Sequence, residues 1–374
     1  MSDELDRVAL FWTGLWGGGA ERVMLTIAQE FIRRRIDVDI VLTTAKGELR
    51  SEVPPEARVF DLNASRIAAS LPSLVRYLRN EEPPVLLTAL KSANCVAIWA
   101  RLIANVSTKI VVSEHSTLSL AIQHSEKLTD RFLPKLMRYT YPYADRIVAV
   151  SEGAADDLAS SLQLQREHIE VVHNPAVTPQ LLEMAREPVD HPWFNGNGLP
   201  VVLGVGRLCA AKDYPTLVRA FRHVRQNRPA RLVILGEGEK RADLEKLSAD
   251  LGIEEWLWMP GFVSNPFKYM AKSSVFALSS KWEGLGNVLI EAMACGTPVV
   301  ATNCKSGPAE ILKDGRYGEL VPVGNPDVLA EAILAALNGE VEVAPAKAVD
   351  PFRVEVAVER YLSVLNACVE EGSE

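Results

Sequence analysis

The chain has 374 residues, of which 48% are hydrophobic and 24% charged, enough for two or three folded domains and too apolar for a disordered protein. The formal net charge of −8 creates no overall positive field, so we expect no nucleic-acid partner. The first residues are acidic, unlike a secretory signal peptide, and no apolar run approaches the about 20 residues that span a bilayer. Five scattered cysteines without a C-x-x-C pair favour a reducing compartment, and we expect a cytoplasmic protein.

The first half of the chain alternates apolar runs with helical patterns. Near-continuous apolar runs predict buried strands at 8–13, 38–43, 85–89, 109–113 and 146–150. Val23, Ile27 and Phe31 share one face of a helix expected over 20–34. This alternation is typical of a parallel sheet with right-handed helical crossovers.

A second α/β rhythm follows a break in the pattern. Prolines and an Asn-Gly-Asn-Gly run predict a linker over 174–200. Beyond it we expect strands at 201–205, 231–235, 275–279 and 298–301, and helices at 213–227, 239–250 and 287–294. The sequence therefore predicts two Rossmann-like domains, 1–178 and 199–350. Their ligands are expected beyond the carboxyl ends of the strands, in the cleft between the domains.

The first candidate site is the glycine run Gly17-Gly18-Gly19, directly after the first strand. Glycines let the backbone approach a phosphate closely, and the following helix points free N–H groups and a partial positive charge at it. A glycine-rich turn that binds nothing would give the same pattern, since the run is not a G-x-G-x-x-G fingerprint.

The second candidate site begins the second half, where Gly206-Arg207 follows a strand and Lys212 comes five residues after the arginine. An arginine at a buried edge offers a fixed fork of donors and a lysine offers a mobile charge, a combination suited to a diphosphate. Two solvated loop cations are the plainer interpretation.

The third candidate site is a strand–turn–helix stretch in which Glu283 stands in a glycine-rich turn and Glu291 inside the helix. The turn offers N–H groups to phosphate oxygens, and the carboxylates can accept hydrogen bonds from sugar hydroxyls. Carboxylates near a helix start could instead be plain capping charges.

Together these stretches resemble the retaining glycosyltransferases of the GT-B fold, specifically family 4 (group 1), whose bacterial members extend lipid-linked oligosaccharides and exopolysaccharides. The resemblance covers nearly the whole chain. It rests on Gly-Gly-Ala-Glu-Arg at 18–22, Ser-Glu-His-Ser at 113–116, Gly206-Arg207 with Lys212, Gly-Glu-Gly at 236–238, Gly-Phe-Val at 261–263, the Glu283-x7-Glu291 spacing, Ala-Met-Ala-Cys-Gly-Thr-Pro at 292–298 and Ser-Gly-Pro-Ala-Glu at 306–310. The implied fold has two facing Rossmann-like domains with a deep cleft, and a final helix, about 351–374, that packs back on the first domain.

The resemblance implies four catalytic residues. Arg207 and Lys212 would neutralise the leaving diphosphate in place of a metal ion. His115 would contact the donor sugar near its reacting carbon, and Glu283 would accept from hydroxyls of the same sugar.

The resemblance also implies a set of donor-binding residues. The backbone at Phe262 and Val263 would hold the base, Glu291 would accept from the ribose, and the turn after Glu283 would face the phosphates. Leu285 stands where many relatives carry an aromatic residue, which we interpret as changed packing under the turn. The full set is Gly18, Gly19, Gly206, Arg207, Lys212, Phe262, Val263, Glu283, Gly284, Leu285, Gly286, Asn287 and Glu291.

The implied activity is transfer of a sugar from a UDP-sugar, with retention and without a metal cofactor, to a growing lipid-linked glycan or other oligosaccharide. Two alternatives remain. One is a UDP-sugar 2-epimerase of the same fold, and the other is a non-catalytic nucleotide-binding protein or a dinucleotide oxidoreductase.

Two further patterns carry no site. Asp37-Val38-Asp39 matches the Asp-x-Asp metal motif of another glycosyltransferase fold, but it opens a strand, and we expect solvated edge carboxylates and no metal. Among the histidines, His115 alone ends a strand in a matching stretch. The others are expected on the surface or in loops: His124, His168, His173, His191 and His223.

A cationic strip is expected on a helix around 127–139. Lys127, Arg131, Lys135 and Arg138 recur at spacings of four, four and three, beside the apolar residues Leu128, Phe132, Leu136 and Tyr139. This pattern is typical of a helix lying on anionic lipid. The lipid-linked acceptors that the resemblance implies would place such a contact at the cytoplasmic face of the inner membrane. Pro134 could kink the helix or mark its start. The alternative is an ordinary helix with its apolar side in the core.

Overall fold

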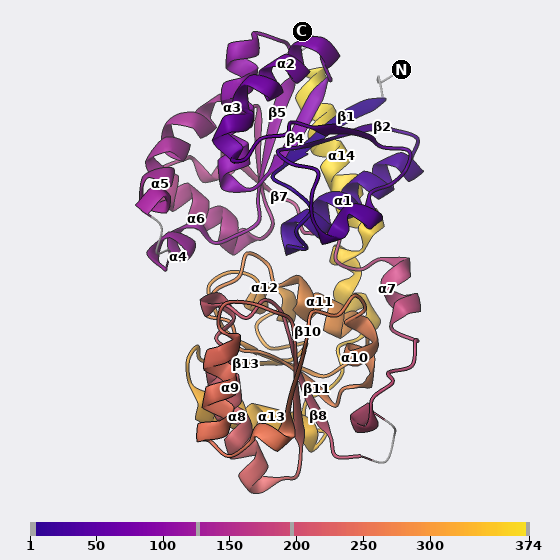
Figure 1. Cartoon of the computed structure of the whole chain (residues 1–374), viewed down its shortest axis with the longest axis vertical. Helices are drawn as coiled ribbons and strands as arrows, with labels where there is room; N and C mark the ends of the chain where they lie inside the picture. Colours follow the sequence, from indigo (N-terminus) through magenta and orange to yellow (C-terminus); the bar gives the residue numbers. More distant parts are fainter. Residues whose placement is uncertain (1–4, 125–127, 195–197, 372–374) are drawn as a thin grey trace. The chain divides into compact units, whose positions relative to one another are not determined.

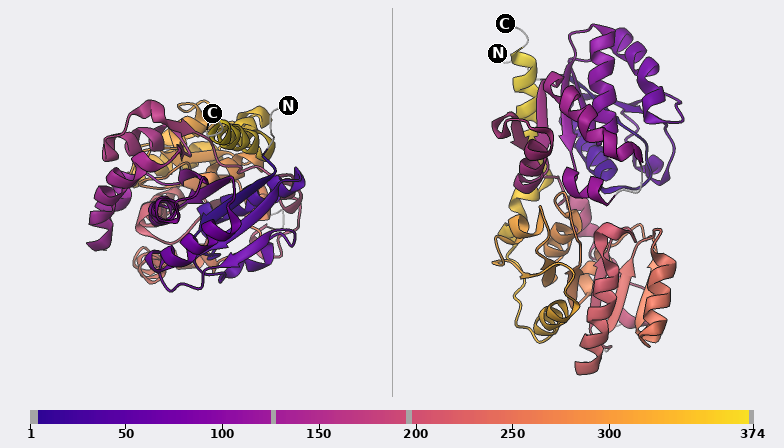
Figure 2. Two further views of the ribbon diagram at one scale, coloured as in Figure 1. Left: turned by 90° about the horizontal axis from the view of Figure 1, so that it is seen from above. Right: turned by 90° about the vertical axis from the view of Figure 1, so that its left-hand side faces the viewer.

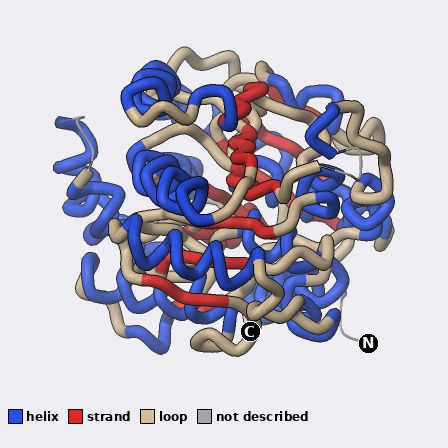
Figure 3. Tube along the Cα trace, turned by 90° about the horizontal axis from the view of Figure 1, so that it is seen from below, coloured by secondary structure: helices blue, strands red, loops and turns tan. Residues whose placement is uncertain are grey.

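The computed structural model describes residues 5–124, 128–194 and 198–371. The chain divides into two compact units, Met1–Pro175 with Arg353–Glu374 and Ala176–Phe352 (Figure 1). Each unit is built on a parallel β-sheet with helices packed against it (Figures 2 and 3). The α/β class with two Rossmann-like sheets, predicted from the alternation of strands and helices, is confirmed.

The first unit contains a seven-stranded sheet in the order β3-β2-β1-β4-β5-β6-β7. Its strands are β1 Arg7–Trp12, β2 Asp37–Leu42, β3 Arg58–Asp61, β4 Val85–Ala89, β5 Lys109–Glu114, β6 Arg146–Ala149 and β7 Ile169–Val171. Its helices are α1 Gly19–Arg33, α2 Leu71–Glu81, α3 Lys91–Ala104, α4 Leu118–Gln123, α5 Leu128–Thr140, α6 Glu152–Leu162 and α14 Val354–Glu370. The strand order reverses between β1 and β4, the point where open parallel sheets bind ligands.

Helices α1 and α14 share one apolar core on this sheet. Val23, Ile27 and Phe31, the predicted stripe of α1, are buried together with Tyr361 and Leu365 of α14. The final helix, yellow in Figure 1, therefore packs on the first unit although it follows the second in sequence.

The second unit contains a six-stranded sheet in the order β10-β9-β8-β11-β12-β13. Its strands are β8 Val201–Val205, β9 Arg231–Leu235, β10 Leu257–Gly261, β11 Val275–Leu278, β12 Val299–Thr302 and β13 Glu319–Val321. Its helices are α7 Pro179–Met184, α8 Tyr214–Asn227, α9 Arg241–Asp250, α10 Phe267–Lys272, α11 Asn287–Ala294, α12 Pro308–Leu312 and α13 Pro326–Leu337. In this sheet the strand order reverses between β8 and β11. Because these two strands are parallel neighbours, the loops that follow them lie side by side at the carboxyl edge of the sheet.

The segment expected to be a linker packs on the second unit. Helix α7 is held by Asn265, whose Nδ2 donates to the carbonyl of Met184 at 2.9 Å. Farther along, the ring of His191 stacks on Trp258 with centroids 3.8 Å apart. His191 therefore lies in a loop, as expected, and its ring is packed there. Residues 195–197 of the segment lie outside the described residues.

No helix among the described residues combines the length and apolar content needed to cross a bilayer. The cysteines are free thiols; Cys95, Cys304 and Cys368 are buried, and burial raises the pKa of Cys95 and Cys304 to about 12.

Candidate active site

The glycine-rich loop after β1 is fixed by its own backbone contacts. The N–H of Leu15 donates to the carbonyl of Lys46 at 3.0 Å, and the N–H of Gly18 donates to the Glu21 carboxylate at 3.2 Å. Glu21 is 7% exposed; burial raises its pKa, against a lowering by N–H groups of the loop. Glu21 thus occupies the Gly18 N–H that the sequence suggested for a phosphate, while open space lies beside Gly19.

Trp16 is a feature of this loop that sequence reasoning missed. Its side chain is 57% exposed although the residues on both sides are fastened. An exposed aromatic ring at the carboxyl edge of the sheet is suited to contact a ligand, but no sequence pattern marked it.

His115 directly follows β5, at the same carboxyl edge. Its Nε2 lies 3.1 Å from the hydroxyl of Ser113, two residues earlier on the same face of the strand. Burial lowers the pKa of His115 to about 4, so its imidazole is neutral at pH 7. A neutral ring offers one donor and one acceptor, which suits contact with a polar substrate.

Glu114, between these two residues in sequence, points to the opposite face and into the core. It accepts hydrogen bonds from the Tyr141 hydroxyl and from Asn94 Nδ2, the latter at 2.9 Å. Burial raises its pKa despite these bonds. The residue therefore joins α3 and the turn after α5 to β5.

Lys212 in the second unit is held by a carboxylate from the neighbouring strand's loop. Its ammonium donates to Oε1 of Glu283 at 2.6 Å, and the hydroxyl of Ser280 donates to the same oxygen at 2.6 Å. Both side chains are largely buried, at 17% and 12% exposure. Burial would lower the pKa of Lys212, but the charge and hydrogen bond of Glu283 outweigh it and raise the pKa. The lysine is therefore a buried, permanent cation.

Arg207 differs from the buried-edge arginine that we expected. Its side chain is 75% exposed and its guanidinium lies 3.5 Å from the exposed Glu239. The N–H of Gly206 donates to the carbonyl of Leu235, which fixes the backbone just before Arg207. The arginine side chain itself extends into solvent. The expectation of an arginine at a buried edge was wrong, and Lys212 is the buried cation of the pair.

The turn between β11 and α11 is packed tightly against the backbone at Gly307. Gly307 has a φ of +93°, and a side chain there would lie 1.8 Å from the Leu285 carbonyl oxygen, so only glycine fits. The Leu285 side chain is 2% exposed, as a packing role under the turn requires. Gly286, at a φ of +99°, precedes the first residue of α11, Asn287, where the sequence predicted the helix to start.

The remaining predicted donor contacts lie on the same unit. Glu291 is half-buried on α11, and Gly284 is buried in the turn. Phe262, just past β10, is 50% exposed, and Val263 beside it is half-buried. The carboxyl ends of β8, β10 and β11 therefore carry the predicted residues of this unit, whereas Gly18, Gly19 and His115 belong to the first unit.

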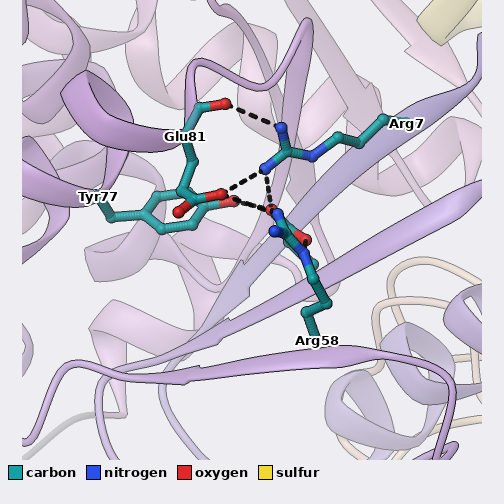
Figure 4. A network of polar contacts seen from close by, with 5 residues as sticks. Arg7, Arg58, Tyr77 and Glu81 are labelled. Carbon is teal, nitrogen blue, oxygen red and sulfur yellow. Dashed lines mark hydrogen bonds and ion pairs between the residues drawn. The ribbon is translucent and has the colours of Figure 1, made fainter.

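The Asp-x-Asp pattern has a structural role at the opposite end of the first sheet (Figure 4). Asp39 is buried and accepts from Arg58 at 2.8 Å, from Arg7 at 2.7 Å and from the Tyr77 hydroxyl at 2.6 Å. Asp37 is exposed, as expected, but the expectation of a solvated carboxylate was wrong for Asp39. Its oxygens accept from two arginines and a tyrosine hydroxyl, so this carboxylate has a structural role in the sheet.

The cationic strip lies on α5, which begins at Leu128 and runs through Pro134, so the proline does not mark its start. Arg131, Lys135 and Arg138 are exposed, and Lys127 lies outside the described residues. The core contact is made by Met137, which is fully buried.

Phe132, Leu136 and Tyr139, three of the four apolar residues beside this strip, are exposed, and the side chain of Leu128 lies outside the described ones. Seven of the thirteen exposed large apolar side chains among the described residues lie on α3, α5 and the turn after α5: Trp99, Leu102, Ile103, Phe132, Leu136, Tyr139 and Tyr143. The two helices are in contact, and Trp99 Nε1 donates to Thr140 at 3.2 Å. We call these seven residues with Arg131, Lys135 and Arg138 the α3–α5 face. The alternative, in which Phe132, Leu136 and Tyr139 lie in the core, was wrong.

Comparisons with known proteins point to one family. Residues 190–348 match the family model described as glycosyl transferases group 1, and residues 17–178 match that of glycosyltransferase family 4. One relative is N-acetylgalactosamine-N,N'-diacetylbacillosaminyl-diphospho-undecaprenol 4-alpha-N-acetylgalactosaminyltransferase of Campylobacter jejuni, 30% identical over 90% of this chain and 91% of its own. Another is the lipopolysaccharide core biosynthesis glycosyltransferase LpsE of Rhizobium meliloti, 29% identical over 84% of each chain.

Solved structures give the fold. HepE of Anabaena, in complex with UDP and glucose, aligns with a TM-score of 0.77 and 21% identity over 96% of this chain and 98% of that one. The lipopolysaccharide outer core galactosyltransferase WaaB aligns with a TM-score of 0.73 and 20% identity over 96% and 99%. These likenesses establish the GT-B fold.

Proposed function

The chain belongs to the group 1 glycosyltransferases, enzymes of the hexosyltransferase type, and we propose that it transfers a sugar from a UDP-sugar, with retention, to a growing polyprenyl-diphosphate-linked glycan. The name of the Campylobacter jejuni relative, with its diphospho-undecaprenol acceptor, supports this class of acceptor. The complex of HepE with UDP supports the nucleotide. The relatives named above are all transferases, and none supports the alternative of a UDP-sugar 2-epimerase.

The observation that carries the proposal is the buried Lys212 ammonium. Burying a charge is costly, and the pairing with Glu283 keeps it charged and fixed in place. A lysine has three N–H donors, and Glu283 is the one acceptor found for them among the described residues, so two remain for a phosphate. A preorganised cation of this kind stabilises the charge that develops on a departing nucleoside diphosphate.

The other residues take the roles implied by the family. Arg207, on its exposed side chain, adds a second cation at the diphosphate, so that no metal ion is needed. His115 contacts the transferred sugar, and Glu283 accepts from its hydroxyls while it positions Lys212. Glu291 accepts from the ribose, and the backbone at Phe262 binds the base.

A thermal-shift measurement with UDP, GDP, ADP and NAD, each with and without EDTA, tests the donor and the metal-free site. A ligand present at a hundred times its dissociation constant stabilises the folded protein by about 2.7 kcal/mol. We expect stabilisation by UDP that EDTA does not change. Stabilisation by GDP or ADP instead would change the donor nucleotide, and a response to NAD alone, or one that EDTA abolishes, would contradict the proposal. The configuration of the first product formed from a UDP-sugar then tests retention.

We also propose that the α3–α5 face binds the anionic surface of the membrane that holds the acceptor. Exposed aromatic side chains next to three cations are the combination that partitions into a headgroup region. Each cation near an anionic surface contributes about 1 kcal/mol, so binding is weak, reversible and sensitive to salt.

Charge reversal tests the membrane surface. The triple variant Arg131→Glu, Lys135→Glu, Arg138→Glu is expected to bind vesicles of phosphatidylcholine and phosphatidylglycerol at least about 100-fold more weakly than the wild type at low salt, as measured by sedimentation. The control variant Lys246→Glu, Lys272→Glu, Lys313→Glu, at exposed positions of the second unit, has the same net charge and should bind as the wild type does. A wild-type protein that stays in the supernatant, or a control that loses as much binding, would rule out this surface.

A further inference from the structure

Three side chains form a hydrogen-bonded series between β5 and the C-terminal helix. The hydroxyl of Ser113 lies 3.1 Å from His115 Nε2 and 3.3 Å from the hydroxyl of Tyr361. Ser113 is fully buried and Tyr361 is 1% exposed, so water does not compete for these bonds. Tyr361 comes from α14, which follows β5 by more than 200 residues. This helix packs on the face of the sheet to which the Ser113 side chain points.

The number of available protons decides in which direction the hydrogen bonds of this series run. If Tyr361 donates to Ser113 and Ser113 donates to His115 Nε2, both hydroxyl protons are used and the imidazole proton must be on Nδ1. In the opposite direction, His115 would donate through Nε2, and the buried Tyr361 proton would have no acceptor among the described residues. The first arrangement leaves only the Nδ1–H of His115 without a partner among the described residues. The second leaves both the bare Nδ1 and the Tyr361 proton without one, so the first is favoured.

We propose that Tyr361 is a positioning residue that acts through Ser113 to hold His115 in the tautomer with its proton on Nδ1. In this tautomer the Nδ1–H, buried and without a partner among the described residues, is the donor that an oxygen of the transferred sugar accepts. This last step rests on the proposed function, whereas the tautomer does not. Burial keeps the ring neutral, so it holds a single proton whose position matters.

Nitrogen-15 NMR of histidine-labelled protein tests the tautomer directly, because protonated and bare ring nitrogens differ widely in shift. The His115 signals, assigned with His115→Gln, are expected to place the proton on Nδ1 in the wild type. Tyr361→Phe, which removes one hydroxyl, should give a mixture of tautomers, as should Ser113→Ala. A wild-type ring protonated on Nε2, or a Tyr361→Phe spectrum identical to that of the wild type, would overturn the proposal.

Kinetics separate this role from a general loss of packing. Tyr361→Phe is expected to lower kcat by about tenfold, the effect of one hydrogen bond lost from a preorganised group, with little change in UDP binding. Tyr77→Phe is the matched control: it removes another buried tyrosine hydroxyl of the same unit, bonded to Asp39, and should lower stability without altering the His115 signals. If the protein showed no glycosyl transfer at all, the NMR result on the His115 tautomer would still hold. The proposed function and the proposed tautomer can therefore be refuted independently.

Discussion

Replacing Lys212 by alanine is expected to lower kcat by about 100- to 1000-fold while the dissociation constant of UDP rises less than about tenfold. The reason is the placement of the ammonium, which is buried, charged and held at 2.6 Å by Glu283. A cation fixed in a site of low polarity gains most when the negative charge on the diphosphate grows, and that happens in the transition state. Single-turnover rates and UDP titrations on the same preparation measure the two effects.

Lys281→Ala is the matched control for this experiment. Lys281 belongs to the same stretch after β11, but its side chain is 44% exposed and faces Asp213 at 3.5 Å. An exposed cation is screened by water, so its removal is expected to change kcat by less than about threefold. Equal losses of UDP affinity and of turnover in Lys212→Ala would contradict a role for Lys212 in the transition state.

The central strands of both sheets could be predicted from sequence, and the edge strands could not. β1, β4, β5, β8, β9 and β11 are covered on both faces, so their apolar runs are continuous. The strands missing from the prediction, β3, β7, β10 and β13, are the outermost strands of the two sheets. None of the four residues of β3, for example, is buried: three are exposed and Phe60 is half-buried, because the strand lies at the edge of the sheet. Without a second covered face, the composition of such a strand does not differ from that of a loop.

The candidate site was predictable where it is local in sequence. The strand, turn and helix from β11 to α11 were predicted with the helix bounds that the structure has, because a glycine turn and a terminating glycine mark them. The pairing of Lys212 with Glu283 spans 71 residues and depends on β8 lying next to β11. That adjacency follows from the strand order, which a periodicity analysis does not contain.

The buried contacts of carboxylates were the main gap in the sequence-based interpretation. Glu21 turns back onto the glycine loop, Glu114 enters the core, and Asp39 receives two arginines. In each case the partner is a donor on another element or a backbone N–H, which the sequence does not reveal. Burial of an acidic side chain with matched donors is decided by tertiary packing, which explains why the prediction of a solvated Asp39 was wrong.

Asp39→Asn is expected to lower the free energy of unfolding of the first unit by about 3 kcal/mol at pH 7. The substitution keeps the shape of the side chain but leaves Arg7 and Arg58 without the carboxylate that both contact, and it weakens the bond from the Tyr77 hydroxyl. Urea titration, with amide hydrogen exchange in β1 and β2 to localise the effect, measures the loss. Asp37→Asn is the control on the same strand: its side chain is exposed, and we expect a change below about 0.5 kcal/mol.

The pH dependence of this difference identifies its cause. Burial alone would raise the pKa of Asp39, but hydrogen bonds from Arg58, Tyr77 and Arg7 outweigh it and hold the pKa below its usual value. A carboxyl with a lowered folded-state pKa stabilises the protein above its unfolded pKa of about 3.9, and this stabilisation is lost as the pH falls through the folded value. The gap between wild type and Asp39→Asn should therefore be constant from about pH 7 to pH 5 and narrow below about pH 4. A gap that persists at the lowest pH at which the protein is folded would mean that the asparagine disturbs packing, and that the ionised carboxylate is not what stabilises this end of the sheet.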